Sequence, residues 1–359
     1  MKINSKKILA AILSAGVIAS SLGATLTSGA AMTSSAADVK ISITDNEYAN
    51  DYLFYNRYRL WGFFPIPSTS KPSRYYTSED QTFYNNALKA ANYCKSLGFD
   101  PTTKKFDAYI KSNNQIQRVN SDTLYLSYAK DNSTLYTNAV GQAGSITVGG
   151  VDSSFMNPMS SVPDIIAHEY VHLVEHRVAG WDALVKQSSF ESGALMEAYS
   201  DILAELSETN TDWRMGTSLF KNNSGKKKCL RDFIDPVNTY RPTNYTGARA
   251  SVKFYDNYKK LKKDYPGDYY SNIDNYSAST IISHAAYLMT TTGLNKATIA
   301  QIWFDSLSEY GSNTTPKFTD CKNAVVSATN KFAAKKGYSS QAKAQLLGRV
   351  NWSFNQVGL

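Results

Sequence analysis

The chain has 359 residues, of which 38 are Lys or Arg and 30 are Asp or Glu, giving a net charge of +8. Apart from Lys226–Lys228 the basic residues are scattered, and no aromatic RNA-binding motif is present, which excludes nucleic acid as an expected partner. Cys94, Cys229 and Cys321 lie far apart without a C-x-x-C pair, which excludes a cysteine metal knuckle or a disulfide framework.

Residues 1–37 have the three-part layout of a secretory signal peptide. The first seven residues contain three lysines, residues 8–26 carry no charge, and small residues lead to Ala36-Ala37. We expect cleavage after Ala36 or Ala37. A transmembrane anchor is the alternative, but Ser, Thr and Gly dilute the stretch below an ordinary spanning helix. The mature protein, with 35 basic and 30 acidic residues, would carry +5.

Residues 38–160 are predicted to form a mixed, β-rich N-terminal lobe. Residues 38 to about 78 are rich in Tyr, Asn, Pro and Ser, which indicates irregular or strand structure. Helical spacing of apolar residues follows from Ser78 to Leu97 and stops at Gly98. Alternating segments separated by turn residues then predict an antiparallel sheet, with strands at 115–119, 123–128, 135–140 and 145–148.

Helical patterns dominate the rest of the chain, residues 161–359. The predicted helices cover 163–178, 191–208, 249–263, 278–291, 296–310, 317–335 and 340–350. Strands followed by helices indicate an α+β fold. We therefore expect a β-rich N-terminal lobe and a mainly α-helical C-terminal lobe.

The helix predicted from Pro163 contains the motif His168-Glu169-Tyr170-Val171-His172. Residues four apart on a helix share a face, so His168 and His172 present two imidazoles side by side. Two neutral imidazoles can hold Zn²⁺ while Glu169 accepts a proton from the water that the metal activates. A chance match on an amphipathic helix is the alternative, but the chain has only 4 histidines and two of them complete the motif.

A catalytic zinc needs a third protein ligand and an open position for water. His176 lies one helical turn beyond His172, about 6 Å farther along the axis at 1.5 Å per residue. A histidine at position 178 would fit the metzincin pattern, but Val178 stands there. Glu197, on the next predicted helix, could aim a carboxylate at the zinc, and Asp201 one turn later could orient a ligand histidine.

Two segments together resemble the zinc-binding segments of the thermolysin-like family of secreted bacterial zinc metalloendopeptidases, or gluzincins. They are H-E-Y-V-H at 168–172 and E-S-G-A-L-M-E-A-Y-S-D at 191–201. The resemblance runs from about residue 79 to the end of the chain. It implies one Zn²⁺ held by His168, His172 and Glu197 in a cleft between the lobes. It further implies Glu169 as the catalytic carboxylate and Asp201 as a partner of His168.

The resemblance also implies substrate-binding residues. Asn138 stands where the family's edge strand binds the substrate backbone, and Arg231 stands where an arginine binds the substrate carbonyl. Four apolar residues would line the pocket after the scissile bond: Met156, Met159, Ile165 and Leu230. This lining predicts cleavage before a large hydrophobic residue.

The chain departs from the family where a histidine normally stabilises the developing oxyanion. Tyr276 occupies that position, and the nearest histidine, His284, falls elsewhere. A phenol can donate a hydrogen bond to an oxyanion, so one hypothesis gives Tyr276 this catalytic role. The alternative is that Tyr276 is a packing residue in a chain with 25 tyrosines.

A second departure concerns calcium. Asp164, Glu208 and Asp212 resemble three acids of the family's buried calcium site, whereas Arg214 and Thr217 stand at two further acidic positions. An arginine among carboxylates can neutralise them without a metal. We therefore expect at most one Ca²⁺, or none.

The sequence thus predicts a secreted, extracellular and monomeric zinc-dependent endopeptidase, with protein or peptide substrates and no membrane partner after signal removal. The alternative is a secreted peptide-binding or surface-interaction protein with a catalytically weakened metalloprotease fold. The missing histidine and calcium acids favour the alternative, whereas the intact Glu169 favours an active enzyme.

Overall fold

The computed structural model describes most of the chain after residue 77 and three short strands before it. The described ranges are 40–44, 46–49, 64–67, 78–101, 103–112, 115–121, 123–128, 138–142, 144–149, 156–181, 189–220, 228–240, 253–266 and 274–359. The predicted signal peptide, residues 1–37, lies outside these ranges, as do the first residues of the helix predicted at 249–263.

The described residues group into two compact units. The first unit comprises Met1–Arg177 and Ser218–Lys221, and the second comprises Val178–Thr217 and Asn222–Leu359. The first unit therefore includes the metal-motif helix up to Arg177, whereas the expected lobe boundary lies at residue 160. The physical reason is the packing of the metal-motif helix: the buried ring of Tyr170 contacts the rings of Phe99 and Phe106, which belong to the first unit.

The first unit contains a four-stranded mixed sheet. In spatial order its strands are β1 (Lys40–Thr44), β6 (Thr123–Tyr128), β8 (Ser145–Val148) and β7 (Ala139–Gln142). β1 and β6 are parallel, as are β6 and β8, whereas β7 and β8 are antiparallel. The predicted antiparallel arrangement is therefore wrong for this sheet. A parallel pair needs a crossover connection, and the segment between β6 and β8, which includes β7, supplies one.

Two further strand pairs of the first unit are antiparallel, and of their strands only β5 was predicted from the alternating pattern. They are β2 (Asn46–Ala49) with β3 (Phe64–Pro67), and β4 (Phe106–Ser112) with β5 (Gln115–Ser121).

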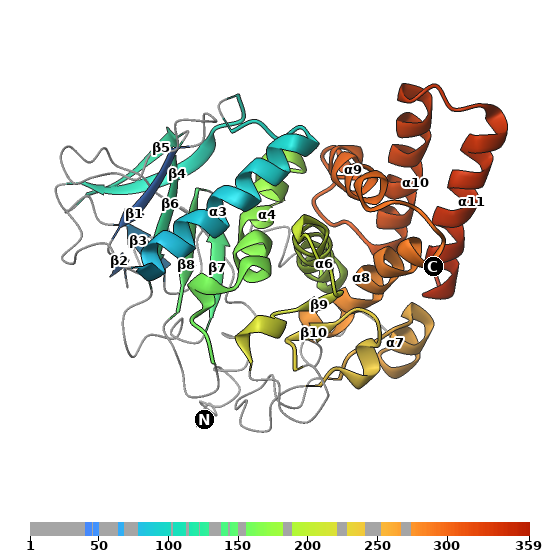
Figure 1. Ribbon diagram of the computed structural model, residues 1–359, viewed down its shortest axis with the longest axis horizontal. Coiled ribbons are helices and arrows are strands. Elements are labelled where there is room, and N and C mark those ends of the chain that lie inside the picture. The colour runs from blue at the N-terminus through green and yellow to red at the C-terminus, as the bar shows by residue number, and fades with distance from the viewer. Residues whose placement is uncertain are drawn as a thin grey trace. The chain divides into compact units, whose positions relative to one another are not determined.

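Two long helices, α3 (Ser78–Leu97) and α4 (Pro163–Val178), accompany the strands of the first unit (Figure 1). α3 has the predicted bounds. Its apolar residues at helical spacing, such as Phe83 and Ala87, are fully buried. Gly98 ends the helix with φ 115°, a left-handed conformation that glycine adopts without a steric penalty.

The start of α4 is tied to α3 through a short 3-10 helix, η1 (Met159–Ser161). The Asn86 side-chain amide donates a hydrogen bond to the Ser160 carbonyl at 3.0 Å. The Ser160 hydroxyl donates to the Glu79 carboxylate at 2.6 Å. These contacts join segments more than seventy residues apart and fix where the metal-motif helix begins.

The second unit is mainly helical (Figure 1). Its α-helices are α6 (Phe190–Ser207), α7 (Tyr258–Asp264), α8 (Asn275–Thr291), α9 (Lys296–Ser306), α10 (Phe318–Lys335) and α11 (Ser340–Gln356). Its remaining elements are the strands β9 (Arg214–Met215) and β10 (Arg231–Asp232) and the 3-10 helices η3 (Pro236–Asn238) and η5 (Leu307–Tyr310), while η2 (Thr217–Leu219) crosses the division between the units. Most predicted helices are therefore confirmed, but α7 begins only at Tyr258 and α11 continues to Gln356.

α6 is the central helix of the second unit, because every residue from Glu191 to Leu206 is buried and it packs against α8, α9 and α10. The Ser189 hydroxyl caps its start by accepting a hydrogen bond from the Ser192 N–H. The Glu191 carboxylate, in its first turn, accepts hydrogen bonds from the Tyr258 hydroxyl and the Phe318 N–H.

An aromatic cluster fixes the middle of α6. The Tyr199 ring meets the rings of Trp181 and Trp303 edge-on, with centroids 5.4 and 5.2 Å apart. Its hydroxyl is hydrogen-bonded to those of Ser306 and Tyr310. Edge-to-face aromatic pairs of this kind each add about 0.5–1.5 kcal/mol beyond the area that they bury.

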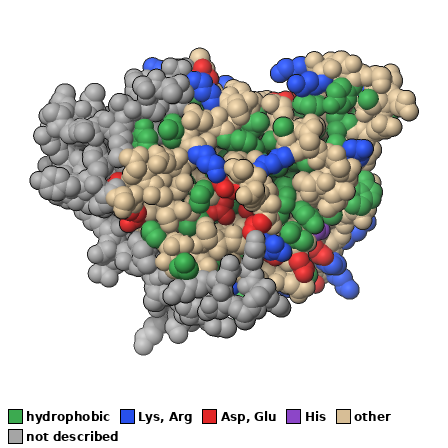
Figure 2. Space-filling model, in the orientation of Figure 1, with side chains coloured by type: hydrophobic (Ala, Val, Ile, Leu, Met, Phe, Trp, Pro, Cys, Tyr) green, Lys and Arg blue, Asp and Glu red, His purple; other side chains and the backbone are tan. Residues whose placement is uncertain are grey.

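The described ranges include all three cysteines, and each of them is a buried free thiol. Lys and Arg side chains are spread over the face shown in Figure 2 and form no single basic patch among its described residues. No helix in the described part of the chain has the length and apolar content needed to cross a membrane.

Candidate metal and catalytic site

α4 presents the predicted metal ligands on a buried helix. Pro163 is its first residue, a position where the missing N–H costs nothing, and Asp164 lies in its first turn. Every residue from Asp164 to Glu175 is buried. Polar side chains on such a helix need partners, because an unsatisfied buried polar group is costly.

His168, Glu169 and His172 form a compact group of possible metal ligands on α4. One nitrogen or oxygen from each lies within 4.8 Å of the others. The two imidazole centroids are 4.8 Å apart, with the ring planes at 86°. Two imidazoles beside a carboxylate are a donor set that zinc accepts, so these residues fit the metal that the motif predicts.

Gly141 of β7 holds the carboxylate of Glu169. Its N–H donates a 2.6 Å hydrogen bond to Glu169 Oε2. A Cβ atom at position 141 would lie only 1.8 Å from the Glu169 carbonyl oxygen. Glycine is therefore required here by the close approach of strand and helix. The role of Gly141 could not be inferred from the sequence, because the motif contains no sign of which strand lies against it.

Glu175 is a second residue that the sequence analysis missed. Its carboxylate is fully buried and lies 3.0 Å from Nδ1 of His172. The i, i+3 spacing from His172 on the same helix was a usable signal, since residues at this spacing lie on one helix face.

The remaining predicted catalytic residues belong to the second unit, where the structure brings several of them together. Glu197 and Asp201 lie one turn apart on α6, and both are fully buried. Arg231 of β10 donates two hydrogen bonds to the Asp201 carboxylate, from Nε at 2.8 Å and from Nη2 at 2.5 Å. This fork is the geometry in which a guanidinium binds a carboxylate most strongly.

The electrostatics of this cluster keep Arg231 charged. Burial by itself would lower the pKa of Arg231, but the adjacent Asp201 carboxylate raises it, helped by Glu197 and Tyr276, and the net shift is upward. The Arg231 guanidinium carbon lies 4.9 Å from the centre of the Tyr276 ring, a cation–π contact. Glu197, Asp201, Arg231 and Tyr276 therefore form one charged cluster.

The two residues considered for the oxyanion differ in their surroundings. Tyr276 is half-buried in the first turn of α8, where the Asp274 side chain accepts a hydrogen bond from its N–H. His284 lies two turns later, with Nδ1 2.7 Å from the Phe233 carbonyl oxygen and its ring stacked on Tyr287 at 5.8 Å. Its imidazole thus has a structural partner within the second unit.

The predicted substrate-binding residues belong to both units. Asn138 directly precedes β7, and its carbonyl accepts a hydrogen bond from the Gly149 N–H. Met159 and Ile165 are buried, whereas the Met156 side chain is 52% exposed. Leu230, half-buried beside Gly216, belongs to the second unit.

Two of the predicted calcium-site acids, Asp164 and Asp212, accept hydrogen bonds from backbone N–H groups. Asp164 accepts a hydrogen bond from the Ile165 N–H at 2.9 Å. Asp212 accepts one from the Arg214 N–H at 3.1 Å, and Arg214 Nε donates to Asp232 at 2.7 Å. The Lys296 ammonium donates to the Glu208 carbonyl and to Thr211. The Arg214 guanidinium thus pairs with Asp232, which is not one of the three predicted calcium-site acids.

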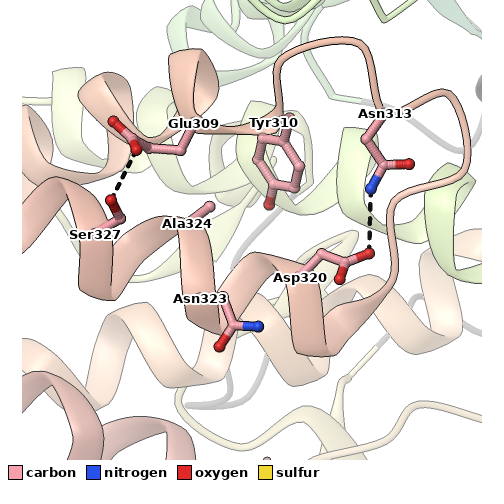
Figure 3. A pocket seen from close by; sticks show the side chains of 7 residues that line it. All are labelled: Glu309, Tyr310, Asn313, Asp320, Asn323, Ala324 and Ser327. Atoms are coloured by element: carbon pink, nitrogen blue, oxygen red, sulfur yellow. Dashed lines mark hydrogen bonds between the residues drawn. The ribbon is translucent and has the colours of Figure 1, made fainter.

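A separate hollow of about 300 Å³ lies among η5, α10 and the loop that joins them (Figure 3). Its two carboxylates already have partners: Glu309 accepts hydrogen bonds from Ser327 and Lys331, and Asp320 accepts them from Asn313 and the Lys317 N–H. These internal bonds account for the polar lining, so we assign it no catalytic role.

Parts of the chain are similar to known proteins. Residues 187–359 match the family model of the thermolysin metallopeptidase α-helical domain. A bacillolysin from Brevibacillus brevis is 30% identical over 233 residues, which cover 63% of this chain and 39% of that protein. The neutral protease NprE from Bacillus pumilus is 29% identical over 227 residues, or 63% of this chain and 64% of that protein. The chain thus spans less than two thirds of the length of either relative.

The fold also matches a solved structure, the precursor of protealysin, a metalloproteinase from Serratia proteamaculans. The TM-score is 0.62, and the match covers 91% of this chain and 89% of that chain. The two sequences are 19% identical, so this likeness shows the fold alone.

Proposed function

Because this chain belongs to the thermolysin-like family of metallopeptidases, we propose that it is a secreted, extracellular zinc-dependent endopeptidase. The observation that carries the proposal is the buried group of His168, Glu169 and His172, in which the Gly141 N–H holds the carboxylate of Glu169. An incidental histidine pair would not need a carboxylate fixed between sheet and helix. The proposed substrates are proteins or peptides.

We propose His168, His172 and Glu197 as the protein ligands of one zinc ion. The resemblance of the 191–201 segment supports Glu197, and its complete burial on α6 is consistent with a carboxylate that has a specific partner. When bound, zinc supplies a Lewis acid that polarises the substrate carbonyl and makes water more acidic. Asp201 is proposed to orient His168. Its carboxylate also accepts both hydrogen bonds from the Arg231 guanidinium.

Glu169 is the proposed general base and then the general acid. It accepts a proton from the attacking water and delivers it to the nitrogen of the leaving amine. The hydrogen bond from Gly141 restricts the orientation of this carboxylate, and such positioned proton transfer contributes about 10²–10⁴-fold to rate. A fixed carboxylate avoids reorganisation during the reaction, which is why its supporting N–H matters.

Other residues are proposed to bind the substrate. Arg231 would bind the substrate carbonyl, and Tyr276 would donate a hydrogen bond to the developing oxyanion. Their mutual cation–π contact supports a shared role, because it orients both groups within one cluster. Asn138 would pair with the extended substrate backbone beside β7.

The proposed specificity is for a large hydrophobic residue after the scissile bond. Met156, Met159, Ile165 and Leu230 are all apolar, and the 52% exposure of Met156 leaves it able to meet a ligand. A peptide library digested with wild-type protein would show this preference at the position after the cut. Preference for a charged residue there would contradict the assignment.

The variant Glu169→Gln tests the proposed activity. Gln keeps the shape of the side chain but cannot accept the proton, so hydrolysis of casein or a quenched peptide should fall by at least about 10²–10⁴-fold. Zinc content should be unchanged, since Glu169 is not a proposed ligand. The matched acid-to-amide control is Glu309→Gln on η5, which should keep wild-type activity. A wild-type protein that binds zinc and peptides without cutting them would instead favour the peptide-binding alternative.

A further inference from the structure

We propose that Glu175 is a positioning residue that orients His172 as a metal ligand. The inference rests on the proposed zinc peptidase function and adds a residue that the motif does not contain. Its basis is the 3.0 Å contact between Nδ1 of His172 and Oε2 of Glu175.

The contact determines which ring nitrogen of His172 can bind a metal. An ionised carboxylate only accepts hydrogen bonds, so Nδ1 of His172 must be the donor in this pair. In a neutral imidazole the other nitrogen, Nε2, then carries the lone pair. Glu175 therefore selects the tautomer in which Nε2 of His172 is ready to bind zinc.

The position of Glu175 on the helix gives a second argument. It lies in the last turn of α4, near the end where the helix dipole is negative, and an anion there is unfavourable. Its carboxylate is also fully buried, which adds a desolvation cost. A zinc ion bound to His172 would place positive charge beside this carboxylate through the imidazole ring that both contact.

The geometry of the pair favours positioning over general packing. His172 and Glu175 are three residues apart on one helix, so the helix backbone fixes their separation. The imidazole of His172 is held at nearly right angles to that of His168, 86° between the planes, which directs the two rings differently. Removing the carboxylate would free the His172 ring to rotate and to change tautomer without removing the ligand itself.

Zinc affinity of the full chain is the first test, measured by competition with a chelator of known affinity. Loss of a residue that supports a metal-ligating histidine typically lowers metal affinity by about 10–100-fold, and we expect this for Glu175→Ala. Glu175→Gln keeps an oxygen that can accept a hydrogen bond from Nδ1 of His172, so its zinc affinity should fall less than that of Glu175→Ala. Glu205→Gln, another buried glutamate whose carboxylate accepts from the Trp213 N–H, is the control and should bind zinc like wild type.

A second measurement needs neither zinc nor a Glu175 variant. The imidazole ¹⁵N chemical shifts of zinc-free wild-type protein, taken where the ring is neutral, should show His172 protonated at Nδ1 and unprotonated at Nε2. With only 4 histidines in the chain, His172→Ala is enough to assign the signals. This readout stays decisive if Glu175→Ala fails to fold.

The outcomes separate this inference from the proposed function. Wild-type zinc binding with unchanged affinity in Glu175→Ala, or His172 protonated at Nε2 in the zinc-free protein, would overturn the role of Glu175 while leaving the peptidase proposal intact. A wild-type protein that binds no zinc would overturn both. Reduced zinc affinity in Glu175→Ala, together with Nδ1 protonation, would establish the positioning role.

Discussion

Two buried acids on α4, Glu169 and Glu175, differ from Asp201 and Asp232 of the second unit in the partners of their carboxylates. On α4 of the first unit, the carboxylates of Glu169 and Glu175 face a backbone N–H and an imidazole. In the second unit, Asp201 faces the guanidinium of Arg231, and Asp232 faces that of Arg214. Asp201 and Asp232 therefore each have an arginine cation of the chain in contact with the carboxylate.

This difference bears on where a bound metal ion would stabilise the protein. A buried carboxylate with a bidentate arginine has its charge balanced by the protein. For a buried carboxylate that contacts an imidazole or an N–H, a nearby dication lowers the cost of burial. We therefore expect bound zinc to stabilise the protein through its ligands on α4 and Glu197, and the arginine–aspartate pairs to stabilise the second unit without a metal.

The largest effect should come from removing the cation of Arg231. In Arg231→Met the Asp201 carboxylate stays buried without its fork, which typically costs about 3–5 kcal/mol of unfolding free energy. Arg231→Lys keeps the charge but not the two-pronged geometry and should cost less. Urea unfolding with and without zinc measures both. An Arg231→Met protein as stable as wild type would contradict the claim that Arg231 balances the charge of the buried Asp201 carboxylate.

A smaller but more local effect is expected from Gly141→Ala. The added methyl would meet the α4 backbone at Glu169, and overpacking of this kind typically costs about 1–3 kcal/mol. The rate of peptide hydrolysis should fall by more than the loss of folded protein explains, because the N–H that holds Glu169 would move.

Gly348→Ala is the matched control for that variant. Gly348 is on α11, and nothing lies within 4 Å of the position that a Cβ atom would take. The same substitution there should raise stability by roughly 0.5–1 kcal/mol. Equal behaviour of the two alanine variants in thermal unfolding and hydrolysis would show that β7 does not constrain Glu169.

The smallest effects concern calcium. The Lys296 ammonium donates to the Glu208 carbonyl and the Arg214 guanidinium to the Asp212 carbonyl, so two cations already lie beside this segment. Adding Ca²⁺ should therefore leave the melting temperature of wild type nearly unchanged. Lys296→Met should cost about 0.5–1.5 kcal/mol, the usual net value of a hydrogen bond. Differential scanning calorimetry gives both quantities. A strong rise in melting temperature with Ca²⁺ would contradict the view that these cations replace a metal.

Regular helices could be predicted from the sequence because each leaves a periodic pattern. Phe83, Ala87 and Cys94 marked α3 with its correct bounds, and all three are buried. The mixed sheet could not be predicted, since alternation shows that a segment is a strand but not which strand it pairs with. β6 and β8 pair in parallel although β7 lies between them in sequence.

In the candidate site, too, some residues could be predicted from the sequence and others could not. His168, Glu169 and His172 were visible because one helix fixes their spacing. Gly141 could not be inferred, because its role depends on a backbone approach between β7 and α4 that leaves no mark in either segment. Glu175 was available from its spacing but lies outside the motif, where an acid on a helix is usually a solvated residue.

The most direct test of the account is zinc analysis of purified wild-type protein beside His172→Ala and Glu197→Gln. The account predicts one zinc ion per wild-type chain and little or none in either variant, since a catalytic zinc depends on three protein ligands. Far-ultraviolet circular dichroism would confirm that both variants are folded. Zinc retained at the wild-type level in folded Glu197→Gln, or absent from the wild-type protein, would contradict the central claim.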